Sequence, residues 1–529
     1  MSSISILSEL DIGRRCCCGE DYGVIRFIGD VEDSKGTWVG IEWDKVERGK
    51  HNGSLKGKQY FICKKEENCA SFLRPKKLSL GMSLPEALLH RYTNVDPEGY
   101  MEESERLIVG NKGGAVKVEL VGMDSVFEER SKLCELKIVS LINMKISNAG
   151  SPGELAQLAP NIATLELVGN KMLPDWKTIS LIAQQLNSLT SLDLSDTNLE
   201  LPEDPLVLTP RLSQLTELYL CSTGISWDRV CEVSHMVPFL SKLHLCFNNI
   251  SIITTQLKCF TSLELLNLEE NDLCDWEHIF SLKTYPNLST LILNNNQLPD
   301  IPYHLVTGHE SIQFSSLSSL SLRDNMIGSW YTVDFINSYF KLKELRIKNN
   351  PVLSNVSSQQ ARQFVIARIA TLTILNNSPV PLAERIDAER YYLSAFSRQW
   401  VESCDESGCV PASHPFRREH PRYLLLVNEI GAPADAKADV LKANRFYDVT
   451  ISAPNYPNLN TLKKKLPHTL TIQKLKGVLH RLYKIDPADQ MLSYVREEFN
   501  CPEIEMDDTL RPLSYYGMQS GYIILVRSK

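Results

Sequence analysis

The chain has 529 residues, of which 43% are hydrophobic and 23% charged, as in ordinary soluble globular proteins of several domains. No apolar run reaches about 18 residues and the N-terminus does not resemble a secretory signal, so we expect no membrane partner. The net charge of −8 argues against general nucleic-acid binding. Several of the 14 cysteines lie inside strand-like runs, which suits reduced thiols in a cytosolic protein.

Residues 10–80 are predicted to form a small β domain. The strand-like runs YGVIRFIG, TWVGIEW, QYFIC and ASFLRP alternate with turns rich in Gly, Asp, Ser and Lys. Their large aromatic residues are too many to bury fully in a domain of about 70 residues, so some should line an exposed groove. Residues 36–80 hold ten Lys/Arg against five Asp/Glu, a local balance that would attract an acidic partner.

The loop RGKHNGSLKGKQYF places donor side chains between two glycines. Gly49 and Gly53 permit a tight turn and close backbone approach, and Lys50, His51 and Asn52 lie between them. Together with GTWVGIEWD, GKQYFIC and SFLRP, this loop resembles the CAP-Gly family over residues 36–75. That resemblance implies binding of acidic C-terminal tails that end in an aromatic residue, as in α-tubulin. The family signature is GKNDG, so His51 and Asn52 replace its asparagine and aspartate.

The CAP-Gly resemblance assigns a peptide-binding groove to specific residues. Lys50 and Arg74 would face the carboxylates of the ligand, and aromatic side chains would line the groove. The alternative for each aromatic is a place in the small core, and for each cation a solvated position. The complete predicted groove consists of Trp38, Trp43, Gly49, Lys50, His51, Asn52, Gly53, Phe61, Phe72 and Arg74.

Residues 81–130 are expected to be a linker or a packing extension. The segments DPEGYMEESER and GNKGG show little sustained periodicity. GNKGG lacks the Lys-Ser/Thr step of a phosphate-binding loop, so we expect no nucleotide site there.

From residue 131 the frame L-x-x-L-x-L-x-x-N-x-L recurs, which predicts an α/β leucine-rich-repeat solenoid with a C-terminal cap over residues 131–400. Leucines should point into the core, and the Asn should bond backbone groups where the chain turns. Side chains between the leucines should form a concave face that suits a large protein partner. The Asn-type positions are 144, 170, 197, 223, 248, 271, 296, 325 and 350, and the candidate contacts are Tyr219, His244, Arg323, Arg346 and Lys348.

Residues 401–440 are turn-rich and are predicted to be a hinge. They contain the one metal-like spacing, Cys404, Cys409 and His414, but no paired CxxC, so we expect no metal. Residues 441–529 give strand, helix, strand, turn and strand, which resembles an α+β ubiquitin-like domain of the β-grasp type. Its helix should bury Ile472, Leu475, Leu479 and Leu482. The chain ends without Gly-Gly, so this domain should dock rather than be conjugated.

The order of these three modules resembles the tubulin-folding cofactor E family of tubulin-specific chaperones. The resemblance implies a cytoplasmic, cytoskeleton-associated chaperone that binds α-tubulin. It would promote assembly and dissociation of the α/β-tubulin heterodimer with cofactors B, C and D. We expect neither catalytic residues nor a cofactor, because nucleophile-elbow, HExxH and phosphate-loop motifs are missing. Two alternatives stay open: a microtubule-associated scaffold, and an adaptor that binds the proteasome or ubiquitin-pathway proteins.

Overall fold

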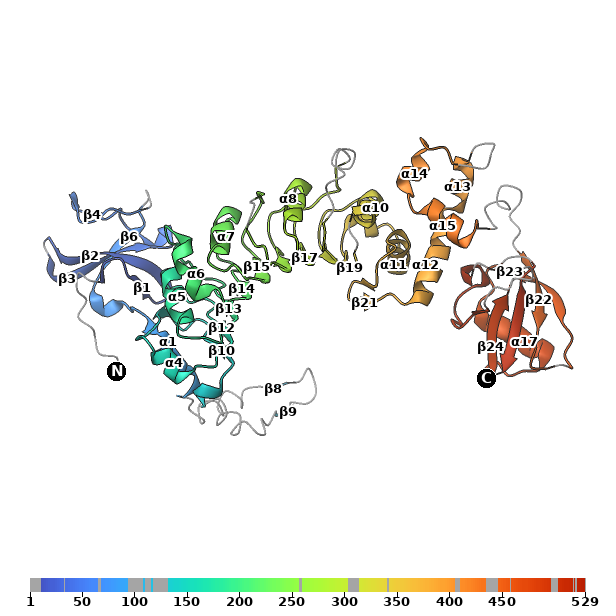
Figure 1. The fold of residues 1–529 in the computed structure, drawn as a ribbon, viewed down its shortest axis with the longest axis horizontal. Coiled ribbons are helices and arrows are strands. Elements are labelled where there is room, and N and C mark those ends of the chain that lie inside the picture. Colours follow the sequence, from blue (N-terminus) through green and yellow to red (C-terminus); the bar gives the residue numbers. More distant parts are fainter. Residues whose placement is uncertain are drawn as a thin grey trace. The chain divides into compact units, whose positions relative to one another are not determined.

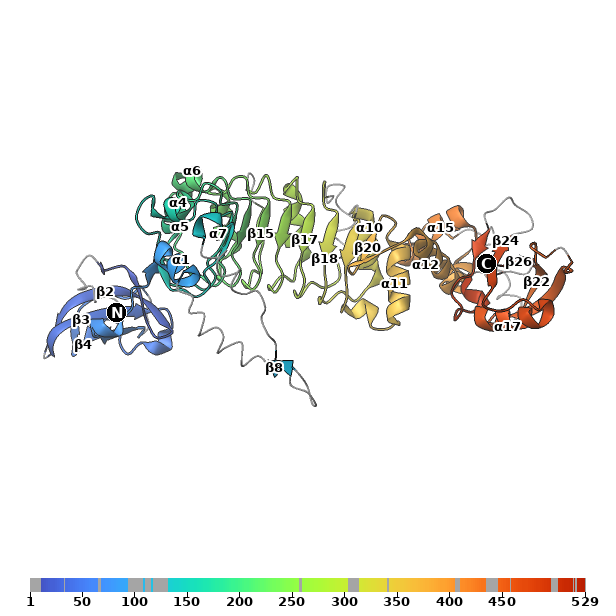
Figure 2. The ribbon, with the colours of Figure 1, turned by 90° about the horizontal axis from the view of Figure 1, so that it is seen from below.

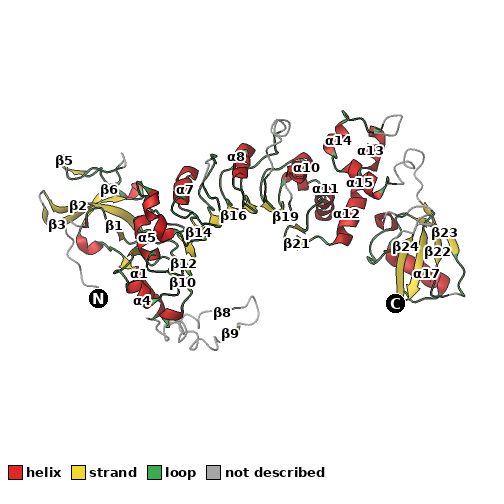
Figure 3. Cartoon of the chain, viewed as in Figure 1, coloured by secondary structure: helices red, strands yellow, loops and turns green. Residues whose placement is uncertain are grey.

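The structure is a computed structural model, and its chain divides into two compact units (Figures 1 and 3). The first unit comprises Met1–Leu298 with Ile312–Leu317, and the second comprises Pro299–Ser311 with Ser318–Lys529. The structure describes residues 11–32, 34–64, 68–93, 108–109, 116–117, 132–255, 259–302, 314–339, 342–404, 410–433, 446–456, 458–495, 503–516, 518 and 521–528.

The first unit begins with a four-stranded antiparallel sheet in the order β1-β2-β3-β6. Its core consists of one face of this sheet, where Cys16, Ile25, Val39, Ile41 and Trp43 pack together. A short hairpin, β4 with β5, follows β3, and the predicted strand QYFIC contributes only its first residue to it. The bounds are β1 Arg15–Cys18, β2 Asp21–Val31, β3 Ser34–Trp43, β4 Ser54–Leu55, β5 Lys58–Gln59 and β6 Ala70–Leu73.

The start of the predicted linker is part of the folded first unit. Strand β7 (Met82–Ser83) pairs in parallel with β11 (Ile146–Asn148). Helix α1 (Leu84–Tyr92) begins with a capping box, in which Ser83 and Glu86 satisfy each other's backbone N–H groups. Leu84, Ala87 and Leu88 are buried, so α1 packs as an extension of the first repeat. Most of residues 94–131 lies outside the described residues, apart from the pair β8 (Ile108–Val109) and β9 (Val116–Lys117).

Seven short parallel strands of the first unit form the leucine-rich repeats. These strands run side by side along the solenoid (Figure 2). They pair in register, with the central leucine of each strand beside the next, as in Leu218 beside Leu243. The strands are β10 Ile138–Ser140, β12 Thr164–Glu166, β13 Ser191–Asp193, β14 Glu217–Tyr219, β15 Lys242–His244, β16 Leu265–Asn267 and β17 Thr290–Ile292, and the helices between them are α4 Glu154–Leu158, α5 Trp176–Ala183, α6 Thr209–Leu212, α7 Trp227–Ser234 and α8 Trp276–Ser281.

The Asn-type positions act as the sequence predicted. Asn248 is 4% exposed, and its amide donates to the carbonyls of Leu220 (2.8 Å) and Leu245 (3.0 Å). Its Oδ1 accepts from the backbone N–H of Thr223 at 2.9 Å. Asn271 repeats the pattern one repeat later by donating to the carbonyls of Leu245 and Leu268. These bonds satisfy buried backbone groups that would otherwise destabilise each turn.

The second unit contains the last repeats and their cap. Its strands β18 (Ser319–Ser321), β19 (Glu344–Arg346) and β20 (Ile374–Leu375) pair in parallel, as in the repeats. Strand β21 (Ser378–Pro379) turns back antiparallel to β20, and helices close the end. The predicted hinge 401–440 differs from the structure, because Phe416, Tyr423 and Leu426 are buried against Tyr392 and Leu393. The helices are α10 Trp330–Tyr339, α11 Ser358–Arg368, α12 Leu382–Ala395, α13 Ser397–Ser403, α14 Pro415–Glu419 and α15 Tyr423–Ile430.

The C-terminal domain is a five-stranded mixed sheet with one long helix, α17 (Ile472–Tyr483). The order is β23-β22-β26-β24-β25, with β22 and β26 parallel at the centre, which is the α+β arrangement that the sequence predicted. The predicted helix face is wrong at Leu482, which is 37% exposed, because Tyr483 takes the core position. The strands are β22 Phe446–Ser452, β23 Leu462–Pro467, β24 Gln490–Val495, β25 Ile504–Glu505 and β26 Ile523–Ser528.

Candidate functional site

Five rings of the N-terminal domain form one continuous cluster, which we call the aromatic cluster: Phe27, His51, Tyr60, Phe61 and Phe72. Phe72 is its centre, with ring centroids 4.9 Å from His51, 5.4 Å from Tyr60, 5.7 Å from Phe61 and 6.0 Å from Phe27. These are the separations at which aromatic rings attract one another. All of them except Phe61 are partly exposed, so the cluster offers ring surface to a ligand.

The sheet brings these rings together on the face opposite its core. Gly40 of β3 lies between Phe27 of β2 and Phe72 of β6 in the strand register. A β-bulge between Ile25 and Phe27 turns the Phe27 side chain away from the core face that Ile25 occupies. A Cβ atom on Gly40 would lie 2.3 Å from the Phe61 ring, so only glycine leaves space for that ring.

The two glycines of the predicted loop fix the path of the backbone beside the cluster. Gly53 has φ +93°, and a Cβ atom there would meet the Phe61 carbonyl oxygen at 2.1 Å. A Cβ atom on Gly49 would meet the Asn68 carbonyl oxygen at 2.0 Å. The loop between them is held by backbone hydrogen bonds from Lys50 and His51 to the carbonyl of Ala70, at 2.7 and 3.2 Å. The loop is therefore a fixed element of the site.

His51 presents a defined hydrogen-bond donor. Its Nδ1 accepts from the backbone N–H of Gly53 at 3.1 Å. Burial lowers the pKa of His51 below its ordinary value, so the ring is neutral at pH 7. A neutral ring that accepts at Nδ1 carries its proton on Nε2. The neighbouring Asn52 is exposed and accepts from the Ser54 hydroxyl at 2.7 Å.

The cations near the aromatic cluster differ in whether a carboxylate or a backbone carbonyl already binds them. Lys50 is exposed, and within the described part of the chain no carboxylate pairs with its ammonium. Lys58 pairs with Glu32 at 3.1 Å and lies 5.4 Å from the Tyr60 ring centroid. The guanidinium of Arg74 is bound to the start of β3, where it donates to the carbonyls of Lys35, Gly36 and Thr37. Of these three cations, Lys50 is thus the most available to an acidic ligand.

Of the two predicted groove tryptophans, one lies in the core and the other is partly exposed and already contacts a cation. Trp43 is 1% exposed in the core, because it shares the inward face of β3 with Val39 and Ile41. Trp38 stacks with Arg74, whose guanidinium carbon lies 3.9 Å from its ring centroid, and donates to Ser34. Sequence reasoning assigned neither Phe27 nor Tyr60 to the groove, although both belong to the aromatic cluster.

A second group of candidate residues lies on the repeat strands of the first unit. The rings of Tyr219 and His244 stack with centroids 4.1 Å apart and an angle of 7°. The Tyr219 hydroxyl donates to Glu217 at 3.0 Å, and His244 Nε2 lies 3.7 Å from the same carboxylate. Burial, together with Glu217, raises the pKa of Tyr219 to about 12, and burial lowers the pKa of His244. Both rings are therefore neutral at pH 7.

The three basic candidates on the second unit's strands are unequal. Arg323 pairs with Asp324 at 2.7 Å, and Arg346 pairs with Glu344 at 2.9 Å. Lys348 is exposed. Two of the three charges are compensated locally, which weakens their attraction for a partner.

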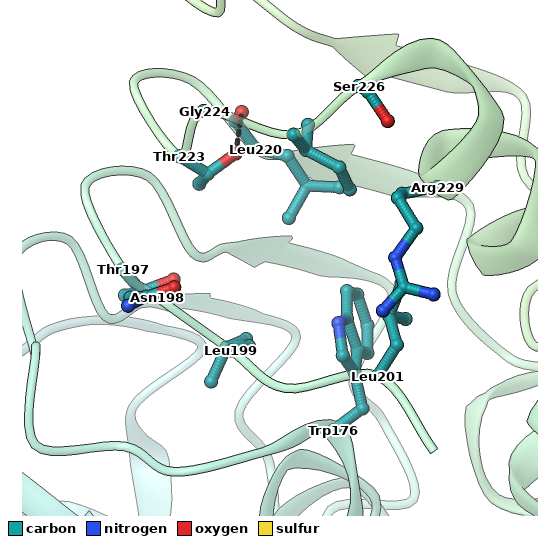
Figure 4. A pocket seen from close by; sticks show the side chains of 11 residues that line it. Trp176, Thr197, Asn198, Leu199, Leu201, Leu220, Thr223, Gly224, Ser226 and Arg229 are labelled. Atoms are coloured by element: carbon teal, nitrogen blue, oxygen red, sulfur yellow. Dashed lines mark hydrogen bonds between the residues drawn. The ribbon is translucent and has the colours of Figure 1, made fainter. Parts of the chain in front are cut away.

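A hollow of 230 Å³ opens between the second and fourth repeats of the first unit (Figure 4). Its charged side chain, Arg229, already pairs with Glu232 at 2.8 Å. The lining is otherwise apolar or made of hydroxyl and amide groups, which gives no constellation for catalysis. The lining residues are Trp176, Thr197, Asn198, Leu199, Leu201, Leu220, Thr223, Gly224, Ile225, Ser226 and Arg229.

Metal-ligating side chains do not gather anywhere in the described ranges: no three His, Cys, Asp or Glu residues meet as a metal site would require. Of the predicted metal-like spacing, Cys409 lies outside the described residues. Among the helices that the structure describes, none has the length and apolar character needed to span a bilayer.

Comparison with protein-family models identifies all three modules. A CAP-Gly domain matches residues 12–78, a leucine-rich repeat matches residues 242–403, and a ubiquitin-like domain matches residues 446–529. These matches confirm the fold class predicted for each part of the chain.

Similar proteins match over almost the whole length. Tubulin-specific chaperone E of Xenopus laevis is 34% identical over 97% of this chain and 98% of its own. Tubulin-folding cofactor E of Arabidopsis thaliana is 33% identical over 95% of this chain and 94% of its own. The solution structure of the ubiquitin-like domain of mouse tubulin-specific chaperone e is 34% identical, covers 17% of this chain and 91% of that one, and has a TM-score of 0.16. The chain belongs to the tubulin-specific chaperone E family.

Proposed function

We propose that this protein is a tubulin-folding chaperone that binds α-tubulin. In this proposal the aromatic cluster holds the acidic C-terminal tail of α-tubulin by its terminal aromatic residue. The observation that carries it is the five-ring cluster beside the exposed Lys50, in a chain whose relatives are named for tubulin. A terminal ring would pack against Phe72 and its neighbours, and the tail's carboxylates would meet Lys50.

The chemistry of the loop supports a carboxylate ligand. His51 Nε2–H offers a neutral donor, and exposed Lys50 offers a charge. Charge-assisted hydrogen bonds to carboxylates are about twice as strong as neutral ones. Because Lys50 is exposed, its contribution should fall as salt increases. The neutral donor of His51 should contribute a part of the binding affinity that does not depend on salt.

We further propose that the repeat strands contact the folded body of α-tubulin. The Tyr219–His244 stack supports this, because it presents two neutral, partly exposed rings on a strand surface. Arg323, Arg346 and Lys348 stay candidate contacts on the second unit. Two modules that bind one client raise each other's effective concentration, so individually weak contacts can produce firm binding.

The same proposal gives the protein its place among tubulin cofactors. It would promote assembly and dissociation of the α/β-tubulin heterodimer in the cytoplasm, with cofactors B, C and D, and would carry out no catalysis of its own. The ubiquitin-like domain favours a second candidate role, an adaptor for the proteasome or ubiquitin-pathway proteins. That role predicts partner association that survives deletion of residues 1–80.

The test uses the full-length protein with unpolymerised tubulin in size-exclusion chromatography. The proposal predicts a complex with free α-tubulin that Phe72→Ala weakens and that Lys77→Ala, an exposed cation of the same domain, leaves unchanged. A microtubule scaffold would instead co-sediment with polymer and ignore free subunits. No complex at low ionic strength would overturn the proposed function.

A further inference from the structure

Two cysteines face each other on adjacent repeats of the first unit. The parallel register of β14 and β15 pairs Tyr219 with His244. Two residues further on, it brings Cys221 beside Cys246, where the backbone N–H of Ser222 donates to the Cys246 carbonyl at 2.9 Å. Neighbouring strands lie about 4.8 Å apart. Disulfide-bonded residues have Cα atoms about 4.4–6.8 Å apart, a range that includes this strand spacing.

The surroundings of Cys221 favour its thiolate. The neighbouring side chains of Cys246 and Ser195 lower the pKa of Cys221 to about 7, although burial opposes them. The backbone N–H of Cys221 donates to Ser195 Oγ at 3.2 Å and so holds this hydroxyl in place. The neighbouring Cys221 and burial raise the pKa of Cys246, so this thiol stays protonated. A thiolate beside a protonated thiol is the arrangement of a redox-active pair.

The other close cysteine pairs lack this combination. Cys231 and Cys259 are 0% and 4% exposed, and burial raises the pKa of Cys231. Burial also raises the pKa of Cys63, which neighbours Cys69, to about 12. Cys221 and Cys246 are both partly exposed. Among the cysteines that the structure describes, only this pair is partly exposed, lies side by side on adjacent repeats and includes a thiol with a lowered pKa.

We propose that Cys221 and Cys246 form a redox-active dithiol that a hydroperoxide converts into a disulfide between neighbouring repeats. The Cys221 thiolate attacks the terminal oxygen of the hydroperoxide and the O–O bond breaks. The leaving alkoxide, or hydroxide when the oxidant is hydrogen peroxide, is protonated to the alcohol or to water. Cys246 sulfur then attacks the Cys221 sulfenic acid, the S–O bond breaks, and water leaves with the Cys246 proton. The two sulfurs lose two electrons, the peroxide gains them, and a small dithiol reverses the reaction. This inference does not depend on the proposed function.

The position of the pair gives the disulfide a defined effect on the surface. Cys221 follows Tyr219 by two residues on the same side of the chain, and Cys246 follows His244 in the same way. The bond would tie the fourth repeat to the fifth beside the stacked rings. Neither sulfur could then donate a hydrogen bond or react with an alkylating reagent.

The experiment treats the full-length protein with hydrogen peroxide at pH 7, blocks free thiols, and maps the products by mass spectrometry. The inference predicts a Cys221–Cys246 cross-linked peptide that disappears after reduction, while Cys231 and Cys259 stay alkylatable after unfolding. In Cys246→Ser, dimedone should trap sulfenic acid at Cys221, whereas Cys221→Ser should give neither product. Absence of the cross-link in the wild-type protein, or equal oxidation of the Cys231–Cys259 pair, would overturn the inference.

Discussion

Gly40 lies beneath the aromatic cluster, and replacing it with alanine should disturb both stability and binding. The new Cβ atom would lie 2.3 Å from Phe61 Cε1, 2.9 Å from Phe61 Cδ1 and 3.0 Å from Phe27 Cβ. Favourable contact between carbon atoms begins at about 3.5 Å, so the Phe61 ring must move by about 1 Å. Phe61 is only 8% exposed, which leaves it little room. Overpacking of this kind costs about 1–3 kcal/mol.

The chain offers a matched control for this substitution. Gly477 lies within helix α17, and a Cβ atom there would meet nothing within 4 Å. Because alanine is the better helix former, Gly477→Ala should stabilise its domain by about 1 kcal/mol. The same chemical change therefore has opposite signs at the two positions.

Hydrogen exchange measured by mass spectrometry on the full-length protein resolves both sites separately. Gly40→Ala should speed amide exchange in β3 and β6 and weaken binding of an acidic peptide that ends in tyrosine, whereas Gly477→Ala should slow exchange in α17 only. If Gly40→Ala left exchange in β3 and β6 unchanged, or slowed it, the assignment of Gly40 as the space for Phe61 would be refuted.

Further predictions concern other residues. Phe72→Ala should weaken binding of the same peptide at least tenfold, as measured by calorimetric titration. Trp43→Phe changes the core instead, so it should lower the free energy of unfolding by about 1–3 kcal/mol in denaturation experiments and change the affinity little. Arg368→Ala removes the ion-pair partner of the buried Asp334 carboxylate. The free energy of unfolding, measured with urea, should fall by about 3–5 kcal/mol, and a decrease below about 1 kcal/mol would contradict this prediction. Burial and Arg368 lower the pKa of His420 to about 3. As pH falls from about 6.5 towards 3, His420 takes up a proton in the unfolded chain but not in the folded chain, so the free energy of unfolding decreases. In His420→Asn, the free energy of unfolding measured across that range should depend less on pH. An unchanged dependence would count against the prediction.

The repeats were predictable from the sequence because their physics is local and recurrent. Each leucine position aligns with the next, and a buried Asn such as Asn248 or Asn271 bonds equivalent backbone groups in its own turn. The segment around Tyr423 and Leu426 was assigned to a hinge because Pro, Gly and Ser dominate its flanks. Its apolar side chains are nevertheless buried on the cap, and tertiary packing outweighs the local composition.

The aromatic cluster was predictable only in part. Alternation along β3 places Trp43 on the face of Val39 and Ile41, a signal in the sequence that could have excluded it from the groove. The same alternation would place Phe27 in the core beside Ile25. The β-bulge between them reverses that assignment, and a single sequence gives no reliable sign of a bulge.

The most direct test of the proposed tail contact is the dissociation constant of an acidic peptide ending in tyrosine for the full-length protein, measured at low and at high salt. The account predicts binding that weakens with salt, that falls when the terminal tyrosine is removed, and that falls in Lys50→Ala but not in Lys77→Ala. Equal affinity for the peptides with and without tyrosine, together with unchanged binding by Lys50→Ala, would contradict it.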